Sequence, residues 1–282
     1  RAPCIYMINT WNESLLHEEL KEYYCAESGR TEVPVEGSIC DIVLQDRSIV
    51  EIQTQNISAL SSKLDKLLVH HRVRLVYPVP VNLYIETYNA DRTLKSRRKS
   101  PKHGTVYQIF PELTKVWHHL ENENLTITLV YSDILQVRIA DGTGSWRRKG
   151  IRLDDRKLIR IHGEQNLCGS NDYLKLLPDS LPEIFTTADL KQLGVGSHAG
   201  YMAWVLNKCE LVELVGKKGR FNAYRIKSPG TFEALATNTA CRAYSIGHPN
   251  KSLDVSTNQP RAGIRARSIV PFPSSDSNET EP

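Results

Sequence analysis

The sequence lacks the signatures of several common protein classes. No apolar run approaches the roughly 18 residues that a membrane span needs. No positively charged start is followed by an apolar stretch, so we expect no secretory signal. A P-loop, a dinucleotide fingerprint and a Ser-His-Asp order are also missing. These absences favour a cytoplasmic protein with no membrane partner.

Cysteines are few and scattered. The six are Cys4, Cys25, Cys40, Cys168, Cys209 and Cys241, and no two form a C-x-x-C pair. A cysteine-based zinc site is therefore not expected. We interpret the six as free, buried thiols in a reducing cytosol.

Composition places the chain among ordinary globular proteins. Of its 282 residues, 40% are hydrophobic and 24% are charged, which is enough for a buried core in one large or two modest domains. The net charge of +4 is mildly basic and permits a nucleic-acid partner without requiring one. From about residue 228, Ser, Thr, Asn and Pro accumulate, so we expect residues 229–282 to form a disordered tail.

The N-terminal half alternates between helical and strand patterns. Apolar residues at helical spacing predict helices, and short Ile- and Val-rich runs predict strands. The predicted order is helix, hairpin, helix and two strands, over residues 12–25, 39–54, 57–69, 73–77 and 81–88. The helical crossover allows strand 73–77 to lie parallel to its neighbour. The pattern continues with a basic loop, a helix, a strand, a basic turn and a hairpin, over residues 91–103, 107–120, 125–131, 142–150 and 151–162.

A different layout follows residue 170. Thr186 to Asp189 reads as a capping box that starts a short helix, and Ser197 can cap a second helix. Residues 211–215 and 221–226 then predict two strands around a basic turn. Two helices followed by a basic-tipped hairpin are typical of a winged helix. We therefore expect residues 1–165 and 170–228 to form separate domains.

Three polar residues interrupt the apolar hairpin. Asp41 lies between Cys40 and Ile42, and Glu51 and Gln53 alternate with Val50 and Ile52. An unpaired buried carboxylate is costly, so these groups need partners or a metal ion. The hairpin can bring them together at one end of a sheet, and hard oxygen ligands suit Mg²⁺ or Mn²⁺. The alternative is that Glu51 and Gln53 simply face solvent from an edge strand.

The spacing Asp41-x9-Glu51-x-Gln53 resembles the PD-(D/E)XK nuclease superfamily. The resemblance implies an α/β fold, a restriction-endonuclease-like mixed sheet flanked by helices, with the small winged-helix (α+β) domain added. It implies metal ligation by Asp41 and Glu51 and catalytic roles for these two, for Gln53 and for residues of the first helix. Glu13 is the helical candidate, with His17 one turn along, and Glu18 or Glu19 could replace Glu13. Gln53 stands where the family usually has Lys.

Basic residues outside this hairpin are candidates for phosphate contacts. They are Arg97, Arg98 and Lys99 in the basic loop, Arg147, Arg148 and Lys149 beside Trp146, and Lys217, Lys218 and Arg220 on the wing. Ser197 and His198 are the nucleic-acid-binding candidates on the second C-terminal helix, which could enter the major groove. Lys63 and Lys66 could also reach substrate phosphates, although helical periodicity explains them equally well.

The function expected from these residues is a Mg²⁺- or Mn²⁺-dependent DNA endonuclease, with a winged helix that aids DNA binding. The rival interpretation is a non-catalytic DNA-binding regulator with a degenerate nuclease fold, and Gln53 is the residue that sustains it. RNA processing or protein interaction is a third alternative, and a homodimer is left open.

Overall fold

The computed structural model describes residues 14–25 and 29–227. Glu13, Cys4, Cys241 and the predicted tail at residues 229–282 lie outside these described residues. The described part is an α/β structure with two sheets. Its large sheet has seven strands, and its small sheet has three.

The first half of the large sheet is built from short elements. In chain order they are α1 (Leu15–Cys25), β1 (Arg30–Val35), β2 (Ser38–Val43), β3 (Ile49–Ile52), the 3₁₀ turn η1 (Ile57–Leu60) and α2 (Ser61–Leu67). Strands β2 and β3 pair antiparallel, which confirms the predicted hairpin. Strand β3 pairs parallel with the start of β4 (Val73–Asn89), which confirms the predicted crossover through α2.

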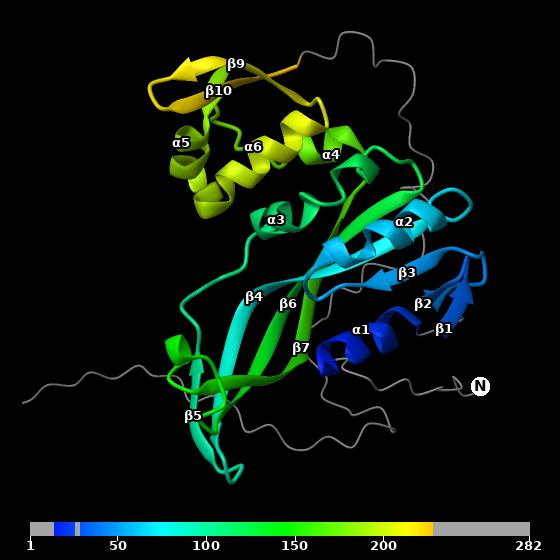
Figure 1. Cartoon of the computed structure of the whole chain (residues 1–282), viewed down its shortest axis with the longest axis vertical. Helices are drawn as coiled ribbons and strands as arrows, with labels where there is room; N and C mark the ends of the chain where they lie inside the picture. Colours follow the sequence, from blue (N-terminus) through cyan, green and yellow to red (C-terminus); the bar gives the residue numbers. More distant parts are fainter. Residues whose placement is uncertain (1–13, 26–28, 228–282) are drawn as a thin grey trace, which may run out of the picture. The chain divides into compact units, whose positions relative to one another are not determined.

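Long strands form the rest of the large sheet. β4 pairs parallel with β6 (Leu125–Ala140), which pairs antiparallel with β7 (Ile151–Leu167), and β5 (Leu94–Lys99) adds to the far part of β4. The sheet order is β1-β2-β3-β4-β6-β7. Figure 1 shows how β4, β6 and β7 extend past the short strands.

Three predictions along these strands are wrong. Residues 73–77 and 81–88 belong to the single strand β4. Its Pro78 and Pro80 lie where β4 pairs with β6 alone, so the N–H groups that these prolines lack are not needed to bind a second neighbouring strand. The predicted basic loop contains β5, and the predicted hairpin at 151–162 is the single strand β7. Both depend on pairing with partners distant in the sequence, which local patterns do not reveal.

Short turns replace the helix that we predicted over residues 107–120. The chain forms η2 (Val106–Ile109), a single α-helical turn α3 (Phe110–Leu113) and η3 (Trp117–His119). Another 3₁₀ turn, η4 (Trp146–Arg148), connects β6 to β7, and α4 (Ser170–Leu174) follows β7. Pro111 stands at the start of α3, where a missing N–H costs little.

The small sheet follows the order β8-β10-β9, with β8 at Ile184–Thr186, β9 at Val212–Lys218 and β10 at Phe221–Ile226. Between β8 and β9 come α5 (Thr187–Leu190), η5 (Lys191–Val195), η6 (Gly196–His198) and α6 (Ala199–Lys208). The Thr186–Asp189 capping box is present, as predicted. Ser197 does not cap α6, because His198 is the N-cap residue and no side chain makes an N-cap hydrogen bond there.

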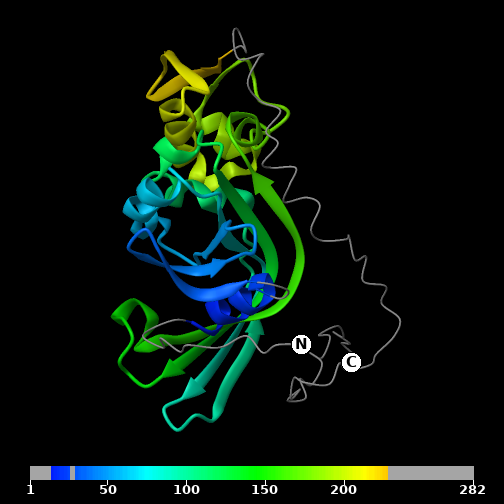
Figure 2. The ribbon, with the colours of Figure 1, turned by 90° about the vertical axis from the view of Figure 1, so that its right-hand side faces the viewer.

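Helices cover the two faces of the large sheet. Leu64 and Leu67 of α2 pack with Ile49 and Leu75, whereas Leu16 and Leu20 of α1 pack with strand residues that point to the other face. Figures 1 and 2 show α1 and α2 on opposite sides of β3. The core on the α2 side continues into the small sheet through α6. Among the described residues, no helix is long and apolar enough to cross a membrane.

Candidate active site

Glu51 is the most deeply buried carboxylate of the predicted site. It lies on β3, between β2 and β4, and is only 1% exposed. Lys63 Nζ donates a hydrogen bond to Glu51 Oε2 at 2.6 Å, and the Asp41 backbone N–H donates to Oε1 at 3.3 Å. The alternative in which Glu51 faces solvent from an edge strand is therefore wrong. Burial and the neighbouring Asp41 charge raise the pKa of Glu51 to about 7, although Lys63 opposes this shift.

Asp41 has a different environment, ten residues earlier on β2. Its carboxylate accepts a hydrogen bond from the Ile52 backbone N–H at 2.7 Å, and His17 Nε2 lies 3.4 Å from the same oxygen. Burial alone would raise the pKa of Asp41. The hydrogen bonds from His17 and Ile52 and the charge of Lys21 outweigh burial and hold that pKa below its ordinary value.

Asp41 and Glu51 both lie where the β2–β3 ladder ends, a place that we call the carboxylate seam. The last backbone pair is Ile42 with Val50, so residues 41 and 51 lie just past the paired region. The Asp41 carboxylate occupies the space between the strands, where it replaces a main-chain acceptor for the Ile52 N–H. The Glu51 carboxylate points toward α2. The Asp41 carboxylate instead lies beside His17 of α1, which covers the other face of the sheet. The Asp41 charge still contributes to the raised pKa of Glu51, after the larger effect of burial.

Helix α1 brings His17 to this seam. Leu16 and Leu20 are fully buried against the sheet, which fixes the rotation of the helix and turns the next residue, His17, toward the strand ends. His17 Nε2 lies 3.0 Å from the Ile52 carbonyl oxygen as well as near Asp41. The structure thus brings His17 together with Asp41, as the sequence predicted.

Lys63 is the site residue whose role sequence reasoning missed. It stands between the buried residues Leu60, Leu64 and Leu67 of the η1–α2 segment, so its side chain runs along the sheet. Besides Glu51, its ammonium group donates to the Ile39 carbonyl at 2.6 Å. The available signal was its helical spacing: position 63 is one turn from both Leu60 and Leu67 and therefore lies on the sheet-facing side.

Two other predicted residues are less defined. Gln53 follows β3 directly, is half-buried and binds the Val76 carbonyl through its backbone N–H at 2.9 Å. Glu13 lies outside the described residues. Of the two alternatives to Glu13, Glu18 is exposed, and the Glu19 carboxylate accepts a hydrogen bond from the Leu158 backbone N–H at 2.5 Å.

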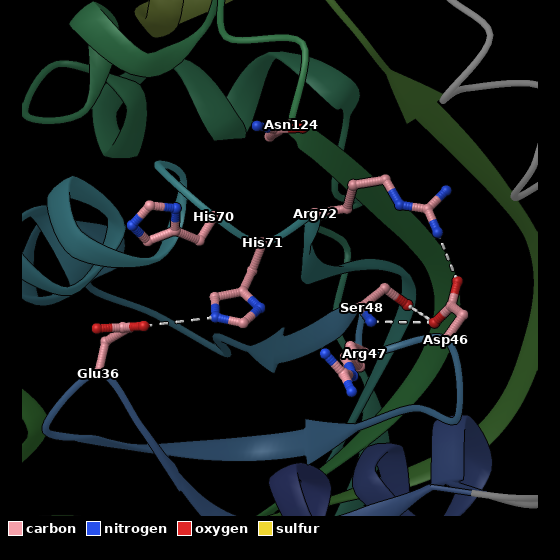
Figure 3. Close-up of a pocket in the computed structure, with 8 residues that line it drawn as sticks. All are labelled: Glu36, Asp46, Arg47, Ser48, His70, His71, Arg72 and Asn124. Carbon is pink, nitrogen blue, oxygen red and sulfur yellow. Dashed lines mark hydrogen bonds and ion pairs between the residues drawn. The ribbon is translucent and has the colours of Figure 1, made fainter.

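Two hollows flank the large sheet. One, of about 420 Å³, lies at the edge where the parallel strands begin, and the loops before β3, β4 and β6 line it (Figure 3). The other, of about 240 Å³, is lined by Thr54 and Gln55, which follow β3, together with Ser14 and residues 153–156. The smaller hollow therefore lies at the carboxyl end of β3, which is the end that Gln53 follows.

Two of the predicted basic groups converge. Arg98 of β5 and Arg148 of η4 both lower the pKa of Arg138, near the end of β6, after the larger effect of burial. Figure 1 shows β5 and the turn before β7 at the same end of the long strands. We call Arg98, Arg138 and Arg148 the basic end. Arg97 instead pairs with Glu86 at 2.5 Å, and Trp146 is 83% exposed with the Arg147 guanidinium 5.6 Å from its ring centre.

The remaining predicted contacts lie in the C-terminal part. Lys217, Lys218 and Arg220 are exposed at the β9–β10 turn, and Ser197 is exposed before α6. His198 is half-buried at the same place. Trp204 and Tyr201 are exposed on α6, at 41% and 49%.

Cys168 departs from the expectation of free thiols, because it is disulfide-bonded. Cys40 and Cys209 are free thiols, and Cys25 Sγ donates a hydrogen bond to the Gly29 carbonyl at 3.3 Å.

Comparisons with known proteins place the chain in a family. A family model described as "Domain of unknown function (DUF8091)" matches residues 14–168, just over half of the chain. The chain belongs to the DUF8091 family. A relative from Treponema pallidum (strain Nichols), named "Uncharacterized protein", is 38% identical over 223 residues, which cover 79% of this chain and 89% of the relative. No solved structure matches. The match begins with α1 and ends after β7, so it contains the whole carboxylate seam.

Proposed function

We propose that this protein is a metal-dependent DNA endonuclease that hydrolyses phosphodiester bonds. The observation that carries the proposal is the seam between β2 and β3, where Glu51 is buried against Lys63 and the backbone of Asp41, and the Asp41 carboxylate is held by His17 and the Ile52 backbone. Perturbed pKa values cluster at functional sites, where burial and neighbouring charges tune acids and bases. The order of helix, hairpin, helix and parallel strand is also the order that the resemblance to PD-(D/E)XK nucleases implies.

The donor set suits Mg²⁺ or Mn²⁺. Mg²⁺ commonly takes one or two carboxylates and keeps several waters. Asp41 and Glu51 supply the carboxylates, and the Ile52 carbonyl lies beside the Asp41 group, since His17 Nε2 is within 3.4 Å of both oxygens. Burial, followed by the Asp41 charge, raises the pKa of Glu51 to about 7, and a cation bound beside Glu51 would favour its ionised form. A bound divalent ion would polarise the phosphodiester and activate water.

The protein's own residues would perform distinct tasks. Lys63 can supply the positive charge that Gln53 lacks, because its ammonium group already contacts Glu51 and could stabilise charge on a phosphate in the same place. Gln53 can orient water or a phosphate oxygen by hydrogen bonding. His17 holds the Asp41 carboxylate and the Ile52 carbonyl in position. Lys63 therefore supports the active enzyme over the degenerate, inactive fold, for which Gln53 is the main argument.

Affinity for DNA would come from the exposed cations. The basic end, Lys149 and the β9–β10 turn carry charges that can neutralise phosphates. The layout of β8, α5, α6, β9 and β10 agrees with a winged helix, in which α6 would enter a groove and Lys217, Lys218 and Arg220 would touch backbone phosphates. Trp146 could stack on an unpaired base.

A cleavage assay tests the proposal. The full chain is incubated with plasmid, linear and single-stranded DNA in Mg²⁺ or Mn²⁺, beside Asp41→Ala, Glu51→Ala and the control Glu36→Gln, a carboxylate at the β1–β2 turn. Cleavage by the wild type and the control but by neither site variant supports the enzyme. DNA binding without cleavage by any form would instead indicate the regulator.

A further inference from the structure

A second group of potential metal ligands lies away from the carboxylate seam. Asp65 of α2 and the adjacent His118 and His119 of η3 place one ligand atom each within 4.8 Å of one another. The expectation of no zinc site was based on cysteine spacing and did not consider histidines. The cluster joins two elements that are more than fifty residues apart in the sequence.

The distances suit one ion between the three side chains. Asp65 Oδ1 lies 3.2 Å from His119 Nε2 and 3.8 Å from His118 Nε2. Two ligands at roughly 2.05 Å from a tetrahedral metal are about 3.4 Å apart. The two imidazole rings are 4.1 Å apart, centre to centre, and are tilted by 46°, so they do not stack face to face.

His119 provides an independent indication of a ligand. Its residue is only 7% exposed, and its Nε2 atom is buried without a hydrogen bond. The Asp65 oxygen is near enough at 3.2 Å, yet it lies off the direction in which the ring nitrogen would donate. A buried polar atom without a partner is costly, and an ion placed on the nitrogen's lone-pair axis would remove that cost.

We propose that Asp65, His118 and His119 bind a borderline transition-metal ion of the Zn²⁺ class. Two imidazoles and one carboxylate select such an ion over Mg²⁺, which prefers oxygen ligands. The side chains of Asp65 and His118 are 58% and 42% exposed, so the ion can enter and a water can take the fourth position. The ion would tie α2 to η3.

Titration of the full chain tests the site. Zn²⁺ is added in competition with a chromophoric chelator, and Co²⁺ binding is followed by its visible absorption. We expect one ion per chain with tetrahedral Co²⁺ bands, and a rise in the wild-type melting temperature with Zn²⁺. His118→Ala and Asp65→Asn should each weaken Zn²⁺ binding by about 100-fold or more, because even outer partners of a ligand contribute roughly 10–100-fold.

Two controls keep the test decisive. His70→Ala removes an exposed histidine just past the end of α2 and should bind Zn²⁺ like the wild type. Glu51→Gln, at the carboxylate seam, should also keep this site. Equal Zn²⁺ affinity in the wild type, His118→Ala and Asp65→Asn would overturn the proposal, as would loss of binding in Glu51→Gln alone. All three readouts, chelator competition, Co²⁺ absorption and melting temperature, are independent of DNA cleavage.

Discussion

The carboxylate seam and the basic end differ in how they hold charge. The carboxylate seam has few charges, and they are largely shielded from solvent: Glu51 is 1% exposed, and the Lys63 side chain is 16% exposed. The basic end consists of three arginines whose positive charges repel one another, and two of them, Arg98 and Arg148, are exposed to water. Electrostatic interactions are strong where water is excluded and are screened by salt where it is present.

On the proposed function, this difference would assign catalysis to the seam and DNA affinity to the basic end. A buried carboxylate pair can hold an ion in a fixed place, whereas exposed arginines attract a polyanion without fixing its atoms. Substitutions at the seam should therefore change the rate of cleavage, and substitutions at the basic end should change binding and its salt dependence.

The largest effect is expected at the two carboxylates. Asp41→Asn and Glu51→Gln remove a metal ligand while keeping side-chain size, and each should lower the rate of DNA cleavage by roughly 1000-fold, since a catalytic metal supplies several kcal/mol. Steady-state cleavage kinetics measure this, and circular dichroism checks the fold. Cleavage at the wild-type rate in either variant would refute the seam as the active site.

The second-largest effect on the rate of DNA cleavage is expected at Lys63, the cationic side chain beside Glu51. Lys63→Met should lower cleavage by about 100-fold, comparable to the loss of one preorganised donor, while DNA affinity changes little. Adding Gln53→Lys to Lys63→Met restores a lysine on the strand and should recover part of the rate. Gln53→Lys alone is the matched control. If Lys63→Met cleaves normally, Lys63 has only a structural role.

The third effect is on stability and pH in the absence of metal. The folded-state pKa of Glu51 is raised to about 7 from an ordinary value near 4.5, so the folded protein binds more protons between these pH values. Its contribution therefore disfavours folding increasingly as pH rises from about 4.5 to 7, by up to about 3 kcal/mol.

Chemical unfolding of wild type and Glu51→Gln in EDTA over this pH range measures the difference. We expect Glu51→Gln to lose less stability than the wild type as pH rises. Parallel pH profiles for the two proteins would contradict the raised pKa.

The smallest effect is expected at the basic end. Arg98→Ala with Arg148→Ala should reduce the slope of log affinity against log salt by about 2, one for each lost phosphate contact, without changing the rate at saturating DNA. Binding titrations at several salt concentrations measure the slope. Arg30→Ala is the control, because Arg30 lies on β1, at the opposite edge of the large sheet from β7. An unchanged slope would place the DNA elsewhere.

Local patterns predicted the short elements well and the long ones poorly. The hairpin of β2 and β3, the crossover helix and the Thr186–Asp189 capping box depend on residues close in the sequence, and all three were confirmed. Strands β5 and β7 are polar and largely exposed, so their pairing with β4 and β6 left no apolar run to recognise. The prolines of β4 looked like strand breakers because one-sided pairing is a tertiary property.

By itself, the sequence determined which strands carry Asp41, Glu51 and Gln53 and that two acids would stand in apolar surroundings, because strand periodicity and the cost of buried charge are local facts. Only the tertiary structure decided that Asp41 lies between the strands, that Lys63 pairs with Glu51, and that Asp65 meets His118 and His119. These contacts depend on how helices and turns pack across a sheet, and no spacing along one chain specifies that packing.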